Sequence, residues 1–115
     1  MLGRVRQLLK THVDRDHFFR LVARRFPEHS AEYQLIVKAY DTAKDAFRGR
    51  TRESNGERYF EHLRAVALIV MEYLRVSDAN VIAAALLHDL PEDIVGWGQD
   101  RMAREFNAEV AQYVW

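Results

Sequence analysis

Apolar residues recur at intervals of three and four along most of the chain, which is the spacing of one face of an α-helix. Ser30 is a good N-cap for one such stretch, Pro27 stops the stretch before it, and no segment alternates with the period of a strand. We therefore expect an all-α fold, a bundle of about six or seven helices. The predicted helices cover residues 2–12, 15–25, 31–47, 59–74, 79–89, 99–106 and 108–115.

The predicted helix 79–89 changes character along its length. Residues 83–87 read Ala-Ala-Ala-Leu-Leu, small and apolar, as a helix buried on most sides must be. His88 and Asp89 follow directly, and Glu92 and Asp93 come just after them. Burying an unpaired carboxylate costs several kcal/mol or more. A metal ion is the simplest partner for such a group of side chains.

Pro91 places these side chains at the end of the helix. A proline disfavours helical geometry in the residue before it, here Leu90. We therefore expect His88 and Asp89 in the last helical turn, and Glu92 and Asp93 just beyond the helix. A helix end opens towards solvent, where a ligand can enter.

A third metal ligand must come from a neighbouring helix. His88 and Asp89 lie about 100° apart around a helix, so both reach one ion only in the notch beside a neighbour. His62 lies in the first turn of the predicted helix 59–74, and antiparallel packing would bring it to the same end of the pair. The chain has no cysteine, so such a site takes its ligands from His, Asp and Glu. This donor set suits manganese, iron, magnesium or an oxygen-rich zinc site.

These residues together suggest hydrolytic chemistry. A bound divalent ion acidifies water towards a roughly neutral pKa. Glu92 would lie close enough to take the proton, and Asp93 would orient the water. Arg52, in the arginine-rich loop before His62, could neutralise the negative charge of a polyphosphate.

Each residue alone has a simpler interpretation. A single histidine at a helix end, such as His88, is more often a capping or core residue, and His62 alone is also more often structural. Glu92 and Asp93 could form a solvated turn. Only the joint pattern favours a metal centre.

Composition narrows the remaining classes. A chain of 115 residues with 49% hydrophobic content fits one domain. Its 17 basic and 17 acidic residues balance, so the overall charge does not point to a nucleic-acid or membrane surface. The longest apolar run, residues 65–71, is far shorter than the roughly 20 residues that span a bilayer. The first residues lack the apolar core of a secretion signal, so we expect a cytoplasmic protein.

The sequence resembles the HD superfamily of metal-dependent phosphohydrolases. Within it, the resemblance is to the hydrolase domain of RelA/SpoT homologues, which remove pyrophosphate from the 3′ position of guanosine tetra- and pentaphosphate. It covers residues 31–115 and leaves residues 1–30 as an N-terminal helical extension that packs on the domain. The matching residues are Arg52, the segment 56–62 (Gly-Glu-Arg-Tyr-Phe-Glu-His), the segment 83–93 and, more weakly, residues 106–111.

The resemblance implies roles for individual residues. It implies that His62, His88 and Asp89 bind the metal, usually manganese, with iron, zinc or magnesium as alternatives. Glu92 and Asp93 are implied as the pair that activates water. It also implies that Arg52 and Tyr59 contact the nucleotide substrate.

The chain also departs from the family pattern. The family often has histidine and glutamine where this chain has Phe47 and Arg50, a proline where Leu63 follows His62, and an apolar residue in place of Pro91. The first two departures affect the substrate contacts. The family's fourth ligand is an aspartate from a helix downstream of Trp115, so we expect the domain to be incomplete at its C-terminus, and the 115-residue piece itself could be inactive.

Three functions remain open. The first is manganese-dependent hydrolysis of the 3′-pyrophosphate of guanosine tetra- and pentaphosphate. The second is HD-type hydrolysis of another nucleotide or phosphorylated metabolite. The third is a catalytically inactive helical binding domain, against which the retention of Glu92 and Asp93 argues. The expected partner is a small nucleotide, without nucleic acid or membrane, and formation of a homo-oligomer is left open.

Overall fold

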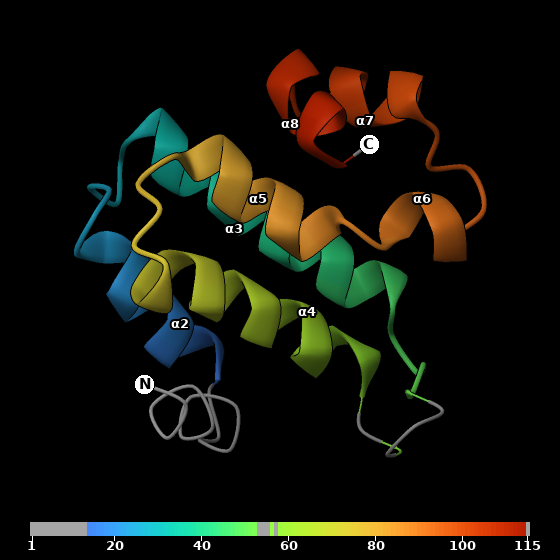
Figure 1. Ribbon diagram of the computed structural model, residues 1–115, viewed down its shortest axis with the longest axis horizontal. Coiled ribbons are helices and arrows are strands. Elements are labelled where there is room, and N and C mark those ends of the chain that lie inside the picture. The colour runs from blue at the N-terminus through green and yellow to red at the C-terminus, as the bar shows by residue number, and fades with distance from the viewer. Residues whose placement is uncertain (1–13, 53–55, 57, 115) are drawn as a thin grey trace.

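The computed structural model describes residues 14–52, 56 and 58–114 of the chain. The regular elements in these ranges are helices, and the only strand-like pairing within them is an isolated bridge between Thr51 and Arg58 (Figure 1). The all-α prediction is confirmed, whereas the predicted helix 2–12 lies outside the described residues. The elements are α2 (Arg15–Ala23), α3 (Ala31–Ala46), α4 (Tyr59–Leu68), the π-helix η1 (Ile69–Tyr73), α5 (Ala79–Leu87), α6 (Leu90–Asp93), α7 (Gln99–Glu105) and α8 (Ala108–Val114).

Four helices, α2, α3, α5 and α8, begin at side chains that accept a hydrogen bond from a backbone amide of the first turn. Asp14 accepts from the His17 N–H at 2.8 Å, and Ser30 accepts from the Tyr33 N–H at 3.1 Å. Asp78 accepts from the Asn80 N–H at 2.9 Å. Such caps satisfy amides that have no partner within the helix and typically stabilise by about 1 kcal/mol. They explain why these starts could be read from the sequence.

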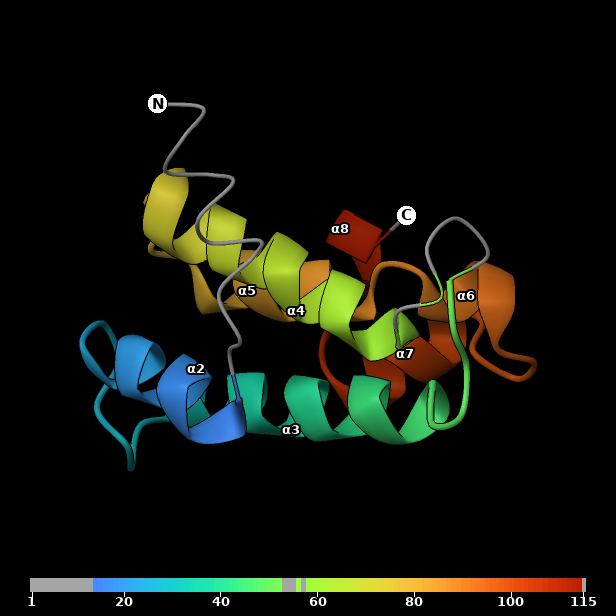
Figure 2. The ribbon, with the colours of Figure 1, turned by 90° about the horizontal axis from the view of Figure 1, so that it is seen from below.

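Helix α5 lies at the centre of the structure. It packs against α3, α4 and α8, and α4 and α5 lie across from α3 when the molecule is viewed from below (Figure 2). Ile82, Ala83, Leu86 and Leu87 are fully buried. Burying each large apolar side chain contributes about 1.5–3 kcal/mol. The apolar half of α5 therefore anchors the polar residues that follow it.

The two ends of this arrangement differ. The C-terminal end of α5, the N-terminal end of α4 and the short helix α6 lie on the right in Figure 1. The C-terminal end of α3 lies there too, whereas the start of α5 lies on the left. Antiparallel packing of α4 and α5 thus brings together residues about 26 positions apart in the sequence.

Two boundaries differ from the sequence-based expectation. The predicted helix 59–74 ends as an α-helix at Leu68 and continues as the π-helix Ile69–Tyr73. Leu90–Asp93 forms a further short helix, with Pro91 in its first turn. Proline suits this position because the first helical amides have no partner within the helix. Glu92 and Asp93 thus lie just beyond α5, as predicted, but on a short helix that the sequence analysis did not predict.

Helix α2, the first in the described residues, shares the core of the following helices. Phe18 and Val22 are fully buried, and Phe18 packs against Tyr40 of α3 with ring centroids 5.1 Å apart. The division into residues 1–30 and 31–115 stays a prediction. None of the helices in the described ranges combines the length and apolar character that crossing a membrane requires.

Candidate metal centre

His62, His88 and Asp89 lie close together at the end of the α4–α5 pair. Each offers one ligand atom, and these three atoms lie within 4.8 Å of one another. The rings of His62 and His88 are 6.2 Å apart between centroids. The structure thus brings together the three residues that the sequence suggested as metal ligands.

The two ring nitrogens of His88 face different partners. Nδ1 lies 2.6 Å from the carbonyl oxygen of Ala85 in the preceding turn. A carbonyl only accepts hydrogen bonds, so Nδ1 carries the proton in the neutral ring and Nε2 keeps its lone pair. This carbonyl contact is also the one expected of a helix-capping histidine. It is equally the support that metal-binding histidines receive on their second nitrogen.

Asp89 presents one oxygen towards His88. Its Oδ1 lies 3.3 Å from Nε2 of His88. Two ligands of one ion are separated by about 3 Å when each lies about 2.1 Å from the metal. Asp89 is the residue before α6, and its side chain makes no capping hydrogen bond to that helix. Its carboxylate is therefore not engaged in the usual role of an aspartate at a helix start.

This donor set fits a divalent metal ion. Two imidazoles and one carboxylate are ligands that manganese, iron and zinc accept. All three residues are partly buried, so they are shielded from bulk water but still reachable. The expectation of a divalent-metal site at these residues therefore agrees with their geometry, and the same donors do not select one of these metals.

Tyr59 lies beside this group and donates to its carboxylates. Its hydroxyl lies 2.7 Å from Oδ2 of Asp89 and 3.2 Å from Oδ2 of Asp93. Burial raises the pKa of Tyr59 above its ordinary value, and the hydrogen bond to Asp89 and the charges of both carboxylates raise this pKa further. The hydroxyl therefore stays protonated and acts as a donor. The sequence reasoning named Tyr59 as a nucleotide contact and missed this interaction.

Glu92 and Asp93 lie on α6, next to the candidate ligands. Both side chains are exposed, and the Asp93 N–H donates to the carbonyl of Asp89 at 3.1 Å. Arg50 donates to the backbone carbonyl of Asp93 at 3.0 Å. The backbone of Asp93 is therefore tied to Asp89 and to Arg50 in the loop before α4. Roles in activating water stay predictions.

The loop before α4 brings further residues to the same end. Phe47 is buried and its ring stacks on Tyr59 with centroids 4.6 Å apart and an interplanar angle of 9°. Arg52 is partly buried, and its carbonyl accepts from the Gly56 N–H at 2.8 Å. Phe47 and Arg50, two of the departures from the family pattern, thus contact Tyr59 and Asp93 respectively. The role of Arg52 in binding a nucleotide stays a prediction.

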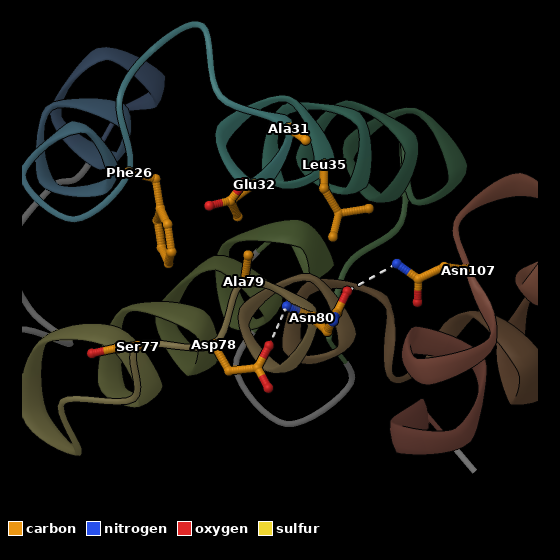
Figure 3. A pocket seen from close by; sticks show the side chains of 9 residues that line it. All are labelled: Phe26, Ala31, Glu32, Leu35, Ser77, Asp78, Ala79, Asn80 and Asn107. Atoms are coloured by element: carbon orange, nitrogen blue, oxygen red, sulfur yellow. Dashed lines mark hydrogen bonds between the residues drawn. The ribbon is translucent and has the colours of Figure 1, made fainter.

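Two depressions in the described surface differ in their relation to this centre. One of about 260 Å³ is lined by residues 91–98, including Glu92 and Asp93. Another of about 570 Å³ lies at the opposite end of α5, around Ala79 and Asn80 (Figure 3). In that second depression, Asn80 accepts from Asn107 at 2.9 Å. The larger volume therefore does not coincide with the candidate metal ligands.

Comparison with known proteins supports the family resemblance. The HD domain family matches residues 39–115. The bifunctional (p)ppGpp synthase/hydrolase SpoT of Escherichia coli is 41% identical over 83 residues, which are 72% of this chain and 11% of that protein. A guanosine-3′,5′-bis(diphosphate) 3′-pyrophosphohydrolase of Vibrio cholerae is 40% identical over 83 residues, with the same shares of 72% and 11%.

A plant protein gives a similar result. A probable chloroplastic GTP diphosphokinase of Oryza sativa subsp. japonica is 37% identical over 81 residues, 70% of this chain and 11% of that protein. The chain thus spans only a small part of the length of these relatives. The similarities confirm the resemblance to RelA/SpoT homologues, and the family match covers most of the chain. The chain therefore belongs to the HD domain family.

Proposed function

We propose that this protein is a metal-dependent phosphohydrolase that removes the 3′-pyrophosphate of guanosine tetra- and pentaphosphate. The observation that carries the proposal is the convergence of His62, His88 and Asp89, with ligand atoms within 4.8 Å of one another. The names of the similar bacterial proteins, which are guanosine-3′,5′-bis(diphosphate) 3′-pyrophosphohydrolases, support the choice of substrate.

His62, His88 and Asp89 would hold the ion, and we propose manganese. A divalent ion there supplies Lewis acidity to a phosphoryl oxygen and lowers the pKa of water. His88 offers Nε2 because Nδ1 faces the Ala85 carbonyl, and Asp89 offers Oδ1 because Oδ2 accepts from Tyr59. These contacts support Nε2 of His88 and Oδ1 of Asp89 as the atoms that would face the ion.

Glu92 and Asp93, the acidic pair on α6, would activate the attacking water. Glu92 is exposed beside the candidate ligands and would accept that proton, while Asp93 would orient the water. Arg52 would neutralise part of the negative charge of the 3′-pyrophosphate. A cytoplasmic location and a small nucleotide as partner, without nucleic acid or membrane, belong to the same proposal, and the oligomeric state stays open.

A second candidate is an HD-type hydrolase for another nucleotide. Phe47 and Arg50 stand where the family often has histidine and glutamine, and both are engaged by neighbouring residues. The altered residues at these two positions leave the base of the substrate unspecified. Guanosine tetraphosphate and a panel of other nucleotides would separate the two candidates.

The direct test is release of pyrophosphate by the full-length protein in the presence of Mn²⁺. We expect the wild-type protein to release pyrophosphate from guanosine tetraphosphate. An Asp89→Ala variant, which loses one candidate ligand, should release none. Absence of release by a protein that has demonstrably bound metal would refute the proposed substrate.

A further inference from the structure

The ring and the backbone of Tyr59 are held by several contacts that do not involve its hydroxyl. Its ring stacks on Phe47, which is only 2% exposed, and the edge of the His62 ring lies against it with centroids 5.9 Å apart. Its N–H donates to the carbonyl of Arg50 at 2.9 Å. Helix α4 has no side-chain cap at its start, so this backbone bond is what ties its first residue to the loop. The phenol ring therefore has little freedom to swing.

The hydroxyl of Tyr59 has one proton and two carboxylate acceptors. The shorter distance, 2.7 Å, is to Asp89, and the longer, 3.2 Å, is to Asp93. A hydroxyl–carboxylate bond is charge-assisted and short when strong, so the proton belongs mainly to the Asp89 bond. The bond occupies Oδ2 of Asp89 and leaves Oδ1 on the side of His88.

The hydrogen bond from Tyr59 would hold the Asp89 carboxylate in one orientation, as groups that hydrogen-bond to metal ligands commonly do. The side chain of Asp89 is 19% exposed and caps no helix. Within the described residues, the Tyr59 hydroxyl at Oδ2 and Nε2 of His88 at Oδ1 are the groups that face its carboxylate. Groups that hold a metal ligand from behind raise metal affinity because less rotational freedom is lost on binding. Tyr59 also joins Asp89 to Asp93, so one hydroxyl links a candidate ligand with a candidate water-orienting residue.

We propose that Tyr59 is a positioning residue that turns Asp89 towards the metal ion, and that it does not contact the nucleotide. This inference rests on the proposed metal centre and adds to it a residue that acts through Asp89. It differs from the substrate contact that the family resemblance implies, and the two roles have different consequences.

A Tyr59→Phe variant separates them. Phenylalanine keeps the ring that stacks on Phe47 and removes only the hydroxyl. Tyr33→Phe is the matched control, because Tyr33 lies at the opposite end of α3 from Phe47 and its ring packs against Phe19 at 5.5 Å. The first measurement is calorimetric titration of each metal-free protein with MnCl₂ alone. The second is steady-state hydrolysis of guanosine tetraphosphate at saturating Mn²⁺.

We expect Mn²⁺ to bind Tyr59→Phe about 10- to 100-fold more weakly than wild type, the usual effect of losing a group behind a metal ligand. Tyr33→Phe should bind like wild type. At saturating Mn²⁺, the KM of Tyr59→Phe for the nucleotide should stay within about twofold of wild type, because no uniform binding interaction has been removed.

Several results would overturn the inference. Unchanged Mn²⁺ affinity in Tyr59→Phe with a raised KM would make Tyr59 a substrate contact. Equal losses in Tyr59→Phe and Tyr33→Phe would show a general effect on folding. A wild-type protein that binds Mn²⁺ but releases no pyrophosphate would refute the proposed function and leave the affinity comparison as the test of Tyr59. A wild-type protein that binds no Mn²⁺ would overturn both.

Discussion

An Asp89→Asn substitution separates the contribution of Asp89 to metal binding from its contribution to folding. The amide has nearly the shape of the carboxylate, and its oxygen can still accept the hydrogen bond that Tyr59 donates at 2.7 Å. What changes is the negative charge, beside Nε2 of His88 at 3.3 Å and close to the carboxylate of Asp93. The variant should therefore leave the metal-free fold almost unchanged and remove a metal ligand.

In the metal-free protein, the substitution changes the free energy of unfolding in two opposing ways. It removes the repulsion between Asp89 and Asp93, and it weakens the hydrogen bond from Tyr59. The Asp89 and Asp93 oxygens both lie near the Tyr59 hydroxyl, so they are at most about 6 Å apart. At an effective dielectric constant of about 20 their repulsion is about 3 kcal/mol, and the exposure of Asp93 reduces it to about 1 kcal/mol or less. Replacing the charge-assisted hydrogen bond from Tyr59 with a neutral one costs about 1 kcal/mol. The free energy of unfolding without metal should therefore change by no more than about 1 kcal/mol.

The effect in the presence of metal is larger. A ligand at 100 times its dissociation constant adds about 2.7 kcal/mol to the free energy of unfolding. For a chain of this size that raises Tm by about 10 °C or more. Wild type should show this increase on addition of Mn²⁺, and Asp89→Asn should show almost none at the same concentration.

Thermal unfolding followed by circular dichroism, with EDTA or with Mn²⁺, measures both quantities. A Tm that falls by more than about 10 °C in EDTA would mean that Asp89 mainly stabilises the fold, contrary to this reasoning. An Asp89→Asn variant that keeps the full increase with Mn²⁺ would place the ion elsewhere.

Three further predictions concern neighbouring residues. Glu92→Gln should lower kcat by about 10²- to 10⁴-fold while calorimetry finds Mn²⁺ affinity unchanged, because Glu92 is proposed to move a proton and not to bind the ion. Arg52→Ala should raise KM for guanosine tetraphosphate with little change in Mn²⁺ affinity, and equal KM values would argue against a phosphate contact. The raised pKa of Tyr59 means that its neutral form stabilises the fold below the unfolded value of 10.0 and that this stability is lost as pH rises above it. Urea unfolding in EDTA should therefore show a smaller loss of stability between pH 9 and 11 in Tyr59→Phe than in wild type.

Local patterns predicted most of the helices. The helix predicted at 31–47 is found at Ala31–Ala46, and that predicted at 79–89 is found at Ala79–Leu87. Both begin at a side chain that caps the first turn, which is a signal contained within a few residues. The helix Leu90–Asp93 was missed because a proline can either end a helix or begin one, and the sequence alone does not distinguish these cases.

The candidate metal ligands could also be predicted, because antiparallel helices bring the start of one to the end of the next. The contacts of Tyr59 could not. Its hydroxyl reaches Asp89, 30 positions away, and its ring stacks on Phe47 from a third helix end. Such contacts depend on the tertiary packing of α3, α4 and α5, which the spacing of apolar residues along the sequence does not predict.

The central claim is that His62, His88 and Asp89 share one divalent ion. Anomalous diffraction from crystals grown with Mn²⁺ tests it most directly, because the signal locates the ion itself. We predict a single peak between these side chains, about 2.0–2.3 Å from one nitrogen of each imidazole and one oxygen of the carboxylate. A peak at other residues, or density that leaves His62 out of contact with a bound ion, would contradict this account.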